Sequence, residues 1–417
     1  MNLFQKKKIE MRRADDTELP HAVVMGLSPT GLHVIRELGR EGVPVIGVSS
    51  ESQSAAFSCY LSGKIIEPDA ECRINRLCEM FPEKNHGQPG AKPVLIPTSD
   101  QDVELIVENH LQLSRHFSFQ AVYSNGLASE IMNKESFYRL CESCGVSYPA
   151  LWKGTAEEIR SLRDDLVYPC IVKPSLIHEV KSLMKGKKVW LVKDQAELDA
   201  IIDSIPDKKA VLLAQEIVPG PESEIGLYCA YFEDGKGATQ AFTARKLRQY
   251  PPGFGSASLV QSSDEVECKR ITEDFLCSIG YNGIAASELK RDPATGEWKM
   301  IEINVRPSLW FSISSFSGKR PVFQAYCKMA NLKMELPENE QAQGVRWRYL
   351  LKDFWSSAFY KINKRYVLPE PVTNSVGPKF LSVSAVFSFD DPKPALAEIF
   401  LFMAKACRRV TGKRYGW

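Results

Sequence analysis

Apolar runs alternate with amphipathic stretches along the first part of the chain. The run AVVMGL at 22–27 ends in a glycine turn, an amphipathic helical pattern follows, and a second apolar run covers 44–48. Two strands joined by a helix imply a parallel sheet. Residues 94–97 and 121–123 predict two further strands of that sheet. The pattern therefore predicts a basic tail over 1–20, followed by a small α/β domain that ends near residue 125.

The same alternation continues to about residue 330. Thr155 with Glu158, and Asp194 with Glu197, have the spacing of a capping box ahead of a helical stretch. A longer helix is predicted over 264–279, closed by a glycine. The predicted strands cover residues 168–172, 211–218, 225–232, 284–290 and 298–304.

Composition excludes several classes of protein. Of 417 residues, 44% are hydrophobic and 25% are charged, and the formal charge is +2, so no global charge favours nucleic acid. Eleven cysteines without regular spacing argue against a disulfide framework and for a reducing compartment. No apolar run approaches the roughly 20 residues of a membrane helix. We therefore expect a cytoplasmic protein of two or three domains.

The first glycine turn has the sequence GLSPTG at 26–31. It differs from the dinucleotide fingerprint GxGxxG because Ser28 replaces the middle glycine and Pro29 removes a backbone donor. A tight turn that contacts a small substrate is the favoured interpretation, and an NAD-dependent enzyme remains an alternative.

Two acidic residues and an amide fall on neighbouring predicted strands. Glu288 lies in one strand, and the next strand ends with Glu302 and Asn304. Side chains two residues apart share a face of a strand, and a hairpin can bring Glu288 to the same face. Carboxylate and amide oxygens are the ligands that magnesium prefers. The alternative is an ordinary solvated strand with alternating polar residues.

Other polar residues upstream could contact a nucleotide. Lys173 ends a predicted strand, and a lysine-rich loop follows at 181–188. The strand that ends in QEIVPG at 215–220 could offer backbone groups to an adenine edge, with Glu224 close enough for ribose hydroxyls. Each of these features also fits a solvated strand end or turn.

The order of these motifs resembles the ATP-grasp superfamily. The motifs on which this resemblance rests are IVKP at 171–174, QEIVPG at 215–220, SELK at 287–290 and EINVR at 302–306. The chain is most similar to carboxylate–amine ligases of the D-aspartate ligase and carbamoyl-phosphate synthetase-like groups. The resemblance implies a Rossmann-like domain at 21–125, then a two-lobed ATP-grasp domain at 126–330, with lobes 126–218 and 219–330. A C-terminal extension at 331–417 would follow.

The resemblance also implies a role for ten residues. Those expected to contact ATP are Lys134 and Lys173 at the phosphates, and Glu216 and Glu224 at the adenine and ribose. Those expected to hold Mg²⁺, with Mn²⁺ as an alternative ion, are Glu288, Glu302 and Asn304. Those expected at the transferred phosphate are Arg306, Arg245 and Lys246. Loop 181–188 departs from the family pattern, which has more small residues there.

The implied reaction is ATP-dependent joining of a carboxylate to an amine. The γ-phosphoryl group converts the carboxylate into an acyl phosphate, the amine attacks, and an amide bond remains. The alternative is an ATP-binding regulatory or scaffold protein of the same fold without catalysis. The motifs specify neither the two small-molecule substrates nor the oligomeric state.

The C-terminal region carries an amphipathic helical pattern. Leu396, Ile399, Phe400 and Met403 share one face, and four basic residues follow at 408, 409, 413 and 414. Such a helix can make a weak peripheral contact with an anionic membrane. The alternative is a face that packs against its own domain.

Overall fold

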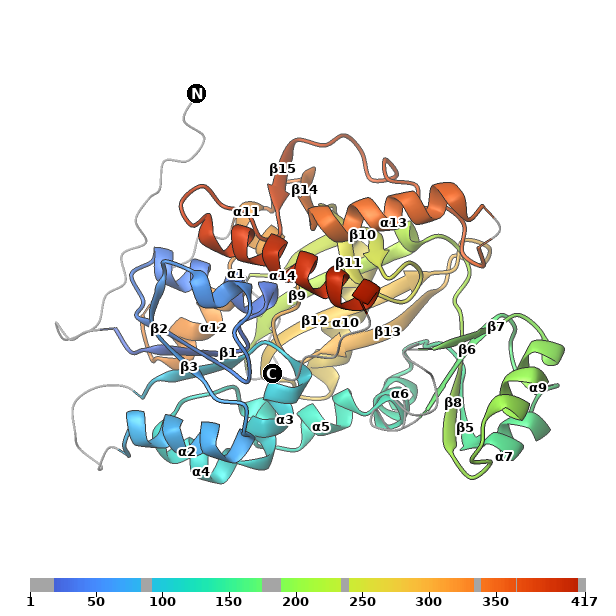
Figure 1. Cartoon of the computed structure of the whole chain (residues 1–417), viewed down its shortest axis with the longest axis horizontal. Coiled ribbons are helices and arrows are strands. Elements are labelled where there is room, and N and C mark those ends of the chain that lie inside the picture. Colours follow the sequence, from blue (N-terminus) through green and yellow to red (C-terminus); the bar gives the residue numbers. More distant parts are fainter. Residues whose placement is uncertain are drawn as a thin grey trace.

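Three sheets organise the computed structural model (Figure 1). The structure describes residues 19–83, 92–174, 189–233, 240–333, 339–364 and 366–411, with side chains up to residue 404 in the last range. The lysine-rich loop 181–188 lies outside the described residues, as do the basic side chains after 404.

The N-terminal sheet is parallel, with strand order β3-β2-β1-β4. All four residues of β1 are buried because helices cover both faces of the sheet. Helix α1 begins where the Ser28 side chain accepts from the Thr30 amide and Pro29 takes the first helical position. The elements are β1 (Ala22–Met25), α1 (Pro29–Arg40), β2 (Val45–Ser49), η1 (Ser54–Phe57), β3 (Leu61–Ile66), α2 (Ala70–Met80), β4 (Val94–Pro97), α3 (Asp100–Glu108) and α4 (His110–His116).

The predicted strand at 121–123 is wrong. Ala121–Tyr123 forms a 3-10 helix, η2. The Val122 amide donates to the carbonyl oxygen of Asn282, and the Tyr123 hydroxyl donates to that of Val305. Val122 and Tyr123 are therefore buried at a junction with the large sheet and do not pair within the N-terminal sheet.

A small four-stranded sheet, order β5-β8-β6-β7, lies at one end of the molecule (Figure 1). The predicted capping box is confirmed: Thr155 accepts from the Glu158 amide, and the Glu158 carboxylate accepts from the Thr155 amide. The elements of this part are α5 (Leu127–Met132), α6 (Lys134–Ser143), β5 (Leu151–Thr155), α7 (Ala156–Ser161), β6 (Cys170–Pro174), β7 (Trp190–Val192), α9 (Gln195–Ser204) and β8 (Val211–Glu216).

A seven-stranded sheet, order β13-β12-β9-β10-β11-β14-β15, forms the centre. Its pairings are antiparallel except for β14 with β15. Helix α10 packs against one face, and α12 packs against the other. The elements are η3 (Glu222–Glu224), β9 (Ile225–Phe232), β10 (Phe242–Tyr250), β11 (Ser256–Ser262), α10 (Val266–Ser278), β12 (Gly283–Arg291), β13 (Trp298–Asn304), α11 (Ser312–Phe316), α12 (Pro321–Met329), β14 (Val345–Arg348) and β15 (Leu381–Ser384).

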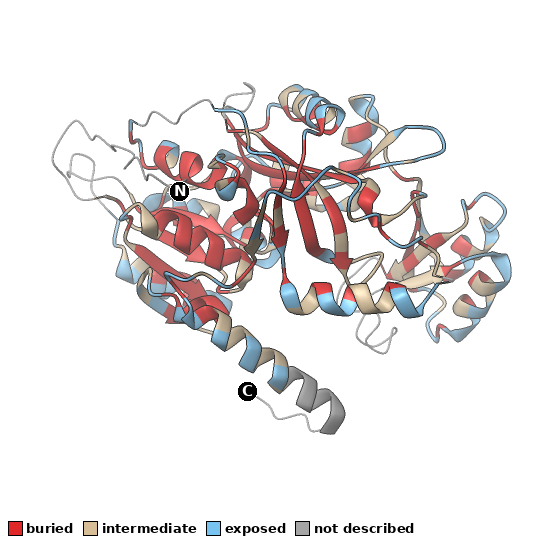
Figure 2. Cartoon of the chain, turned by 90° about the horizontal axis from the view of Figure 1, so that it is seen from above, coloured by how far each residue is buried: buried red, intermediate tan, exposed pale blue. Residues whose placement is uncertain are grey.

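The segment after residue 331 is built into the fold. Its strands β14 and β15 extend the large sheet, and α13 (Leu350–Ile362) packs against β10 and β11. Helix α14 (Lys393–Thr411) starts against η1 of the N-terminal domain and then leaves the body of the molecule, as Figure 2 shows. Among the described residues, no helix has both the length and the apolar character needed to cross a membrane.

Candidate active site

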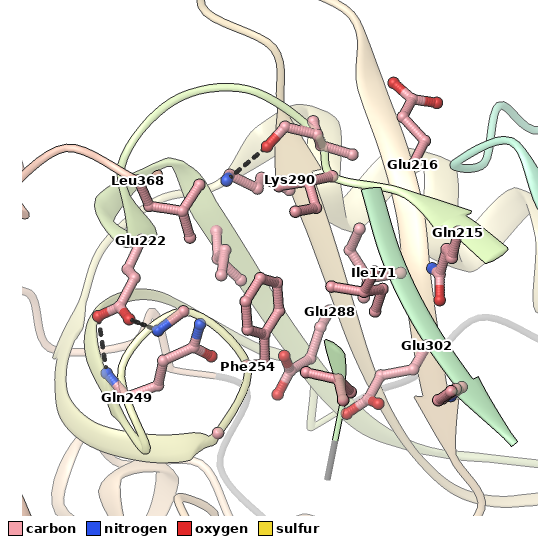
Figure 3. A pocket seen from close by; sticks show the side chains of 18 of the residues that line it. Ile171, Gln215, Glu216, Glu222, Gln249, Phe254, Glu288, Lys290, Glu302 and Leu368 are labelled. Atoms are coloured by element: carbon pink, nitrogen blue, oxygen red, sulfur yellow. Dashed lines mark hydrogen bonds between the residues drawn. The ribbon is translucent and has the colours of Figure 1, made fainter. Parts of the chain in front are cut away.

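A cavity of about 240 Å³ lies between the small sheet and the large sheet (Figure 3). Strands β6 and β8 of the small sheet supply one wall, and β12 and β13 of the large sheet supply the other. Its lining includes Lys134, Ile171, Lys173, Gln215, Glu216, Ile217, Val218, Glu222, Ile225, Gln249, Phe254, Glu288, Lys290, Ile301, Glu302 and Leu368.

Glu288 and Glu302 lie side by side at one end of this cavity. They are directly paired across β12 and β13, and both side chains point into the cavity (Figure 3). Asn304, two residues along the same strand, donates from its amide nitrogen to Glu302 Oε1 at 3.3 Å. That contact leaves the amide oxygen of Asn304 for another partner. The structure thus brings the three predicted metal ligands together.

Lysines surround the two carboxylates. Lys246 forms an ion pair with Glu288, and its side chain is only 2% exposed. Withdrawal from water raises the pKa of Glu288. The same effect acts on Glu302, but Lys134 and Lys246 outweigh it and lower the pKa of that carboxyl. At least one carboxylate of the pair is therefore held in its charged form by the lysines.

Lys134 and Lys173 line the cavity from the side of the small sheet. Desolvation lowers the pKa of Lys134 to about 8, against the opposing effect of Glu302, and it lowers the pKa of Lys173. The Lys134 ammonium also donates to the carbonyl oxygen of Ile301, next to Glu302. Two lysines and two carboxylates thus line the same cavity, an arrangement that suits a metal-bound polyphosphate.

The Glu216 carboxylate is turned away from the cavity centre (Figure 3). It accepts from the backbone amide of Ala150 at 2.9 Å and from Lys299 Nζ at 2.7 Å. Because Lys299 belongs to β13, this contact joins the small sheet to the large one. The predicted adenine contact can then come only from the backbone or the stem of Glu216, since its carboxylate is engaged.

Glu224 does not line the cavity, whereas Glu222 does. The Glu224 carboxylate lies 3.3 Å from Arg291, so the predicted ribose contact has no support in its position. Glu222 is fully buried and accepts from the backbone amide of Gln249 at 2.9 Å and the Tyr360 hydroxyl at 2.8 Å. Burial raises the pKa of Glu222 despite these donors. The sequence PESE at 221–224 contains both glutamates, but it does not indicate which of them lines the cavity.

Arg245 and Lys246 separate to opposite faces of β10. Side chains of adjacent strand residues alternate, and Lys246 takes the face of Glu288. Arg245 takes the other face, where it pairs with Glu265 and donates to the carbonyl oxygen of Ser223 at 3.1 Å. Of these two residues, only Lys246 therefore contacts a candidate metal ligand, and the position of Arg245 gives no support to its predicted role at the transferred phosphate.

Arg306 follows the metal-ligand strand and reaches the N-terminal domain. Its Nε and Nη2 atoms both lie 2.8 Å from Oδ1 of Asp100. It is not among the residues that line the cavity, and its charge helps to lower the pKa of Glu302. Arg306 thus lies beyond the end of the cavity that Glu302 lines.

Lys290, Phe254 and Leu368 are among the lining residues that were not predicted as site residues. Lys290, within the SELK motif, donates to the carbonyl oxygens of Val218 and Gly220 at 2.7 and 2.8 Å. Burial lowers the pKa of Lys290 to about 8. Phe254 and Leu368 add apolar walls. Nothing in the local sequence around Leu368 indicated that the C-terminal segment returns to this cavity.

The donor set limits which ion fits. Among the described residues, no group of three or more His, Cys, Asp or Glu side chains is placed to hold a metal ion. The candidate set is two carboxylates and one amide oxygen, all hard donors. This set suits Mg²⁺ or Mn²⁺ and does not suit a soft ion.

Comparison with known proteins gives one similar sequence of assigned activity. No family model matches the chain. The D-aspartate ligase of Enterococcus faecium (strain Aus0004) is 27% identical over 235 residues, which are 54% of this chain and 55% of that protein. The chain thus covers about half the length of this relative.

Solved structures match over a larger part of the chain. The ADP complex of purK, an N5-carboxyaminoimidazole ribonucleotide synthetase, gives a TM-score of 0.58 at 14% identity, covering 77% of this chain and 80% of that one. The L-amino acid ligase from Bacillus licheniformis gives 0.57 at 14% identity, with 79% of each chain covered. Biotin carboxylase from Campylobacter jejuni gives 0.57 at 14% identity, covering 79% of this chain and 74% of that one. These enzymes share one architecture, and the chain therefore has the ATP-grasp fold that its motifs predicted.

Proposed function

We propose that the protein is an ATP- and Mg²⁺-dependent ligase that activates a carboxylate as an acyl phosphate and joins it to an amine. The observation that carries this proposal is the pair Glu288 and Glu302, side by side in a cavity that Lys134 and Lys173 also line. The similarity to a D-aspartate ligase supports the same reaction class.

ATP would bind along the cavity. The apolar residues Ile171, Ile225, Phe254 and Leu368 provide surfaces for the adenine ring. Lys134 and Lys173 would bind the phosphates at the other end. Glu288, Glu302 and Asn304 would hold Mg²⁺, which supplies positive charge to the phosphate oxygens during transfer.

The chain's own residues would then position and neutralise the reacting groups. Phosphoryl transfer depends mainly on alignment and on stabilisation of charge. Lys246 holds Glu288 in place through its ion pair, and Arg306 would steady the transferred phosphate on the acyl group. No side-chain nucleophile is required, because the substrate carboxylate attacks the phosphorus atom directly.

The setting of the reaction is also a proposal. The ten cysteines whose side chains the structure describes are all free thiols, which favours a reducing compartment. We propose that the protein works in the cytoplasm on two small molecules, and D-aspartate is the first carboxylate to test.

We also propose a weak peripheral contact of α14 with an anionic membrane. Leu396, Ile399, Phe400 and Met403 are 68%, 47%, 68% and 53% exposed. The same helix is attached to the body on its other side, where Glu398 accepts from the Tyr349 hydroxyl. An exposed apolar face followed by basic residues fits an interface of acyl chains and anionic headgroups.

A substrate panel tests the ligase reaction. Pairs of carboxylates and amines, D-aspartate included, are screened for release of ADP and phosphate, and the adducts are identified by mass spectrometry. We expect one pair to stimulate ADP release and give an amide. Glu302→Gln should lower that rate at least about 100-fold, because it removes a charged metal ligand.

The control is Glu267→Gln, on the outer surface of α10, where Glu267 is 53% exposed and pairs with Arg270. Near-normal turnover of Glu302→Gln would remove Glu302 from the metal site. If the protein binds ATP but releases no ADP with any pair tested, the result would instead favour the alternative function, an ATP-binding regulatory or scaffold protein without catalysis.

A further inference from the structure

The carboxyl ends of β1 and β4 meet where the strand order of the N-terminal sheet reverses. β1 has β2 on one side and β4 on the other, and both pairings are parallel. Ligands of open parallel sheets bind beside the strand ends at such a switch point. The loop after β4 and the turn after β1 also contact each other, since Thr98 Oγ1 donates to the carbonyl oxygen of Met25 at 2.7 Å.

Gly26 allows this close contact. A Cβ atom at Gly26 would lie 2.3 Å from Thr98 Oγ1 and 3.0 Å from Asp102 Oδ2, and its φ of +95° also favours glycine. The loop after β4 is held from its other end as well, because the Ser99 side chain caps α3 by accepting from the Asp102 amide. Asp100, the first residue of α3, therefore has a fixed backbone position at the switch point.

Asp100 links this point to the phosphate end of the candidate active site. Both of its contacts with Arg306, at 2.8 Å, use the same oxygen, Oδ1, so Oδ2 lies outside the ion pair. The Asp100 side chain is 59% exposed, whereas Arg306 is only 14% exposed. A solute can thus reach the carboxylate while the arginine is mostly covered.

We propose that Asp100 binds the attacking amine as its ammonium form and accepts its proton. This inference rests on the ligase reaction proposed above. If Arg306 steadies the acyl phosphate, a group in direct contact with Arg306 lies next to the electrophile. A carboxylate there attracts a cation, and the neighbouring Asp102 adds a second acidic side chain. The acceptor class is therefore a primary amine that is charged at neutral pH, such as the α-ammonium group of an amino acid.

Asp100 would act as the general base that removes a proton from the ammonium group. An ammonium nitrogen has no lone pair, so it must lose one proton before it can attack. Asp100 takes that proton and returns it to solvent, and the neutral amine forms a C–N bond with the acyl carbon. The C–O bond between the acyl carbon and the phosphate then breaks, and the phosphate leaves with the electron pair. The nitrogen loses a second proton, which the departing phosphate carries away as hydrogen phosphate. The products are one amide, one hydrogen phosphate and one proton.

Hydroxylamine separates this role from a structural one. It is uncharged near neutral pH and traps acyl phosphates as hydroxamates without needing a base. In Asp100→Asn, hydroxamate formation from the true carboxylate and ATP should stay within about threefold of wild type. Amide formation with the true amine should fall at least about 100-fold, the size expected for loss of a general base. Its residual rate should rise about tenfold per pH unit below the amine pKa, because only the neutral amine reacts.

The matched control is Asp274→Asn on α10, an exposed aspartate 3.3 Å from Arg270 and outside the cavity. If Asp100→Asn loses hydroxamate and amide formation equally, Asp100 only positions Arg306 and the inference is wrong. Full retention of both activities also overturns it. If wild-type protein forms no hydroxamate with any carboxylate, the ligase proposal itself fails, an outcome distinct from the other two.

Discussion

Lys134 connects the electrostatics of the cavity to a measurable pH dependence. Desolvation lowers its pKa from 10.5 to about 8. Below pH 8 the ammonium is charged and can bind a phosphate, and above pH 8 it is increasingly neutral. We therefore expect kcat/KM for ATP in the free enzyme to fall by up to about tenfold per pH unit above pH 8. Arginine keeps its charge, so Lys134→Arg should move this decline to higher pH.

Lys290 could also cause this pH dependence, because it lines the same cavity and its pKa is also lowered to about 8. Lys290→Arg is therefore measured beside Lys134→Arg. A decline that persists in Lys134→Arg but moves in Lys290→Arg would assign the titration to Lys290. Lys153→Arg, an exposed pair of Glu135 on the small lobe, serves as the control and should leave the profile unchanged.

At the residue scale, sequence could predict what local geometry determines. Two-residue periodicity put Glu302 and Asn304 on one face, and the hairpin register brought Glu288 beside them. The orientation of the other predicted side chains depends on partners that are distant in the sequence. Lys299 engages the Glu216 carboxylate from 83 residues away, and Glu288 pairs with Lys246 from 42 residues away, which leaves Arg245 to Glu265. No short motif carries that information.

Asp391 helps to attach the C-terminal segment to the N-terminal domain. Its carboxylate is completely buried and pairs with Arg36 at 2.9 Å. It also accepts from the Ser58 hydroxyl at 2.7 Å and the Cys59 amide at 3.0 Å. Removing one partner of a buried pair leaves the other charge uncompensated. Asp391→Ala should therefore lower the free energy of unfolding by about 3–5 kcal/mol.

The neighbouring Asp390 is a matched control, since it pairs with Arg40 at the same distance of 2.9 Å but is 42% exposed. Asp390→Ala should cost no more than about 1 kcal/mol because solvent screens the pair. Urea unfolding followed by tryptophan fluorescence measures both. Equal effects of the two substitutions would show that burial of Asp391 adds nothing to the attachment.

At the element scale, the sequence predicted fully buried strands better than half-exposed ones. β1 and β9 are buried throughout, and their apolar runs marked them clearly. β3 and β5 are half exposed and carry polar or glycine residues, so no apolar run marked them. β14 and β15 are four residues each and join the sheet through partners far away in the chain. Their pairing, more than their own sequence, makes them strands.

On the scale of the whole molecule, the C-terminal segment connects parts that the sequence pattern had separated. Leu368 lines the cavity between the small and large sheets, and Tyr360 donates to Glu222, a buried residue that also lines it. Asp391 then fixes the same segment to the N-terminal domain, just before α14 begins. The outer face of α14 is thus held at a fixed place on the body and presents apolar side chains to solvent.

This fixed position makes the membrane contact testable without truncating the chain. Leu396→Ser with Phe400→Ser removes two exposed apolar side chains, 68% exposed each, and leaves the Glu398 contact in place. Sedimentation with vesicles rich in anionic lipid should fall at least about tenfold relative to the unaltered chain, since each side chain contributes apolar area at the interface. Binding to either form should weaken with added salt.

Leu111→Ser is the control, because Leu111 is an apolar side chain, 75% exposed, on α4 of the N-terminal domain. Ligase activity in solution should be the same for all three proteins, since α14 does not line the cavity. If the double substitution leaves vesicle binding unchanged and instead abolishes a dimer, the face contacts a second copy of the chain. The membrane proposal would then be wrong, because one apolar face of this size cannot be buried in both places at once.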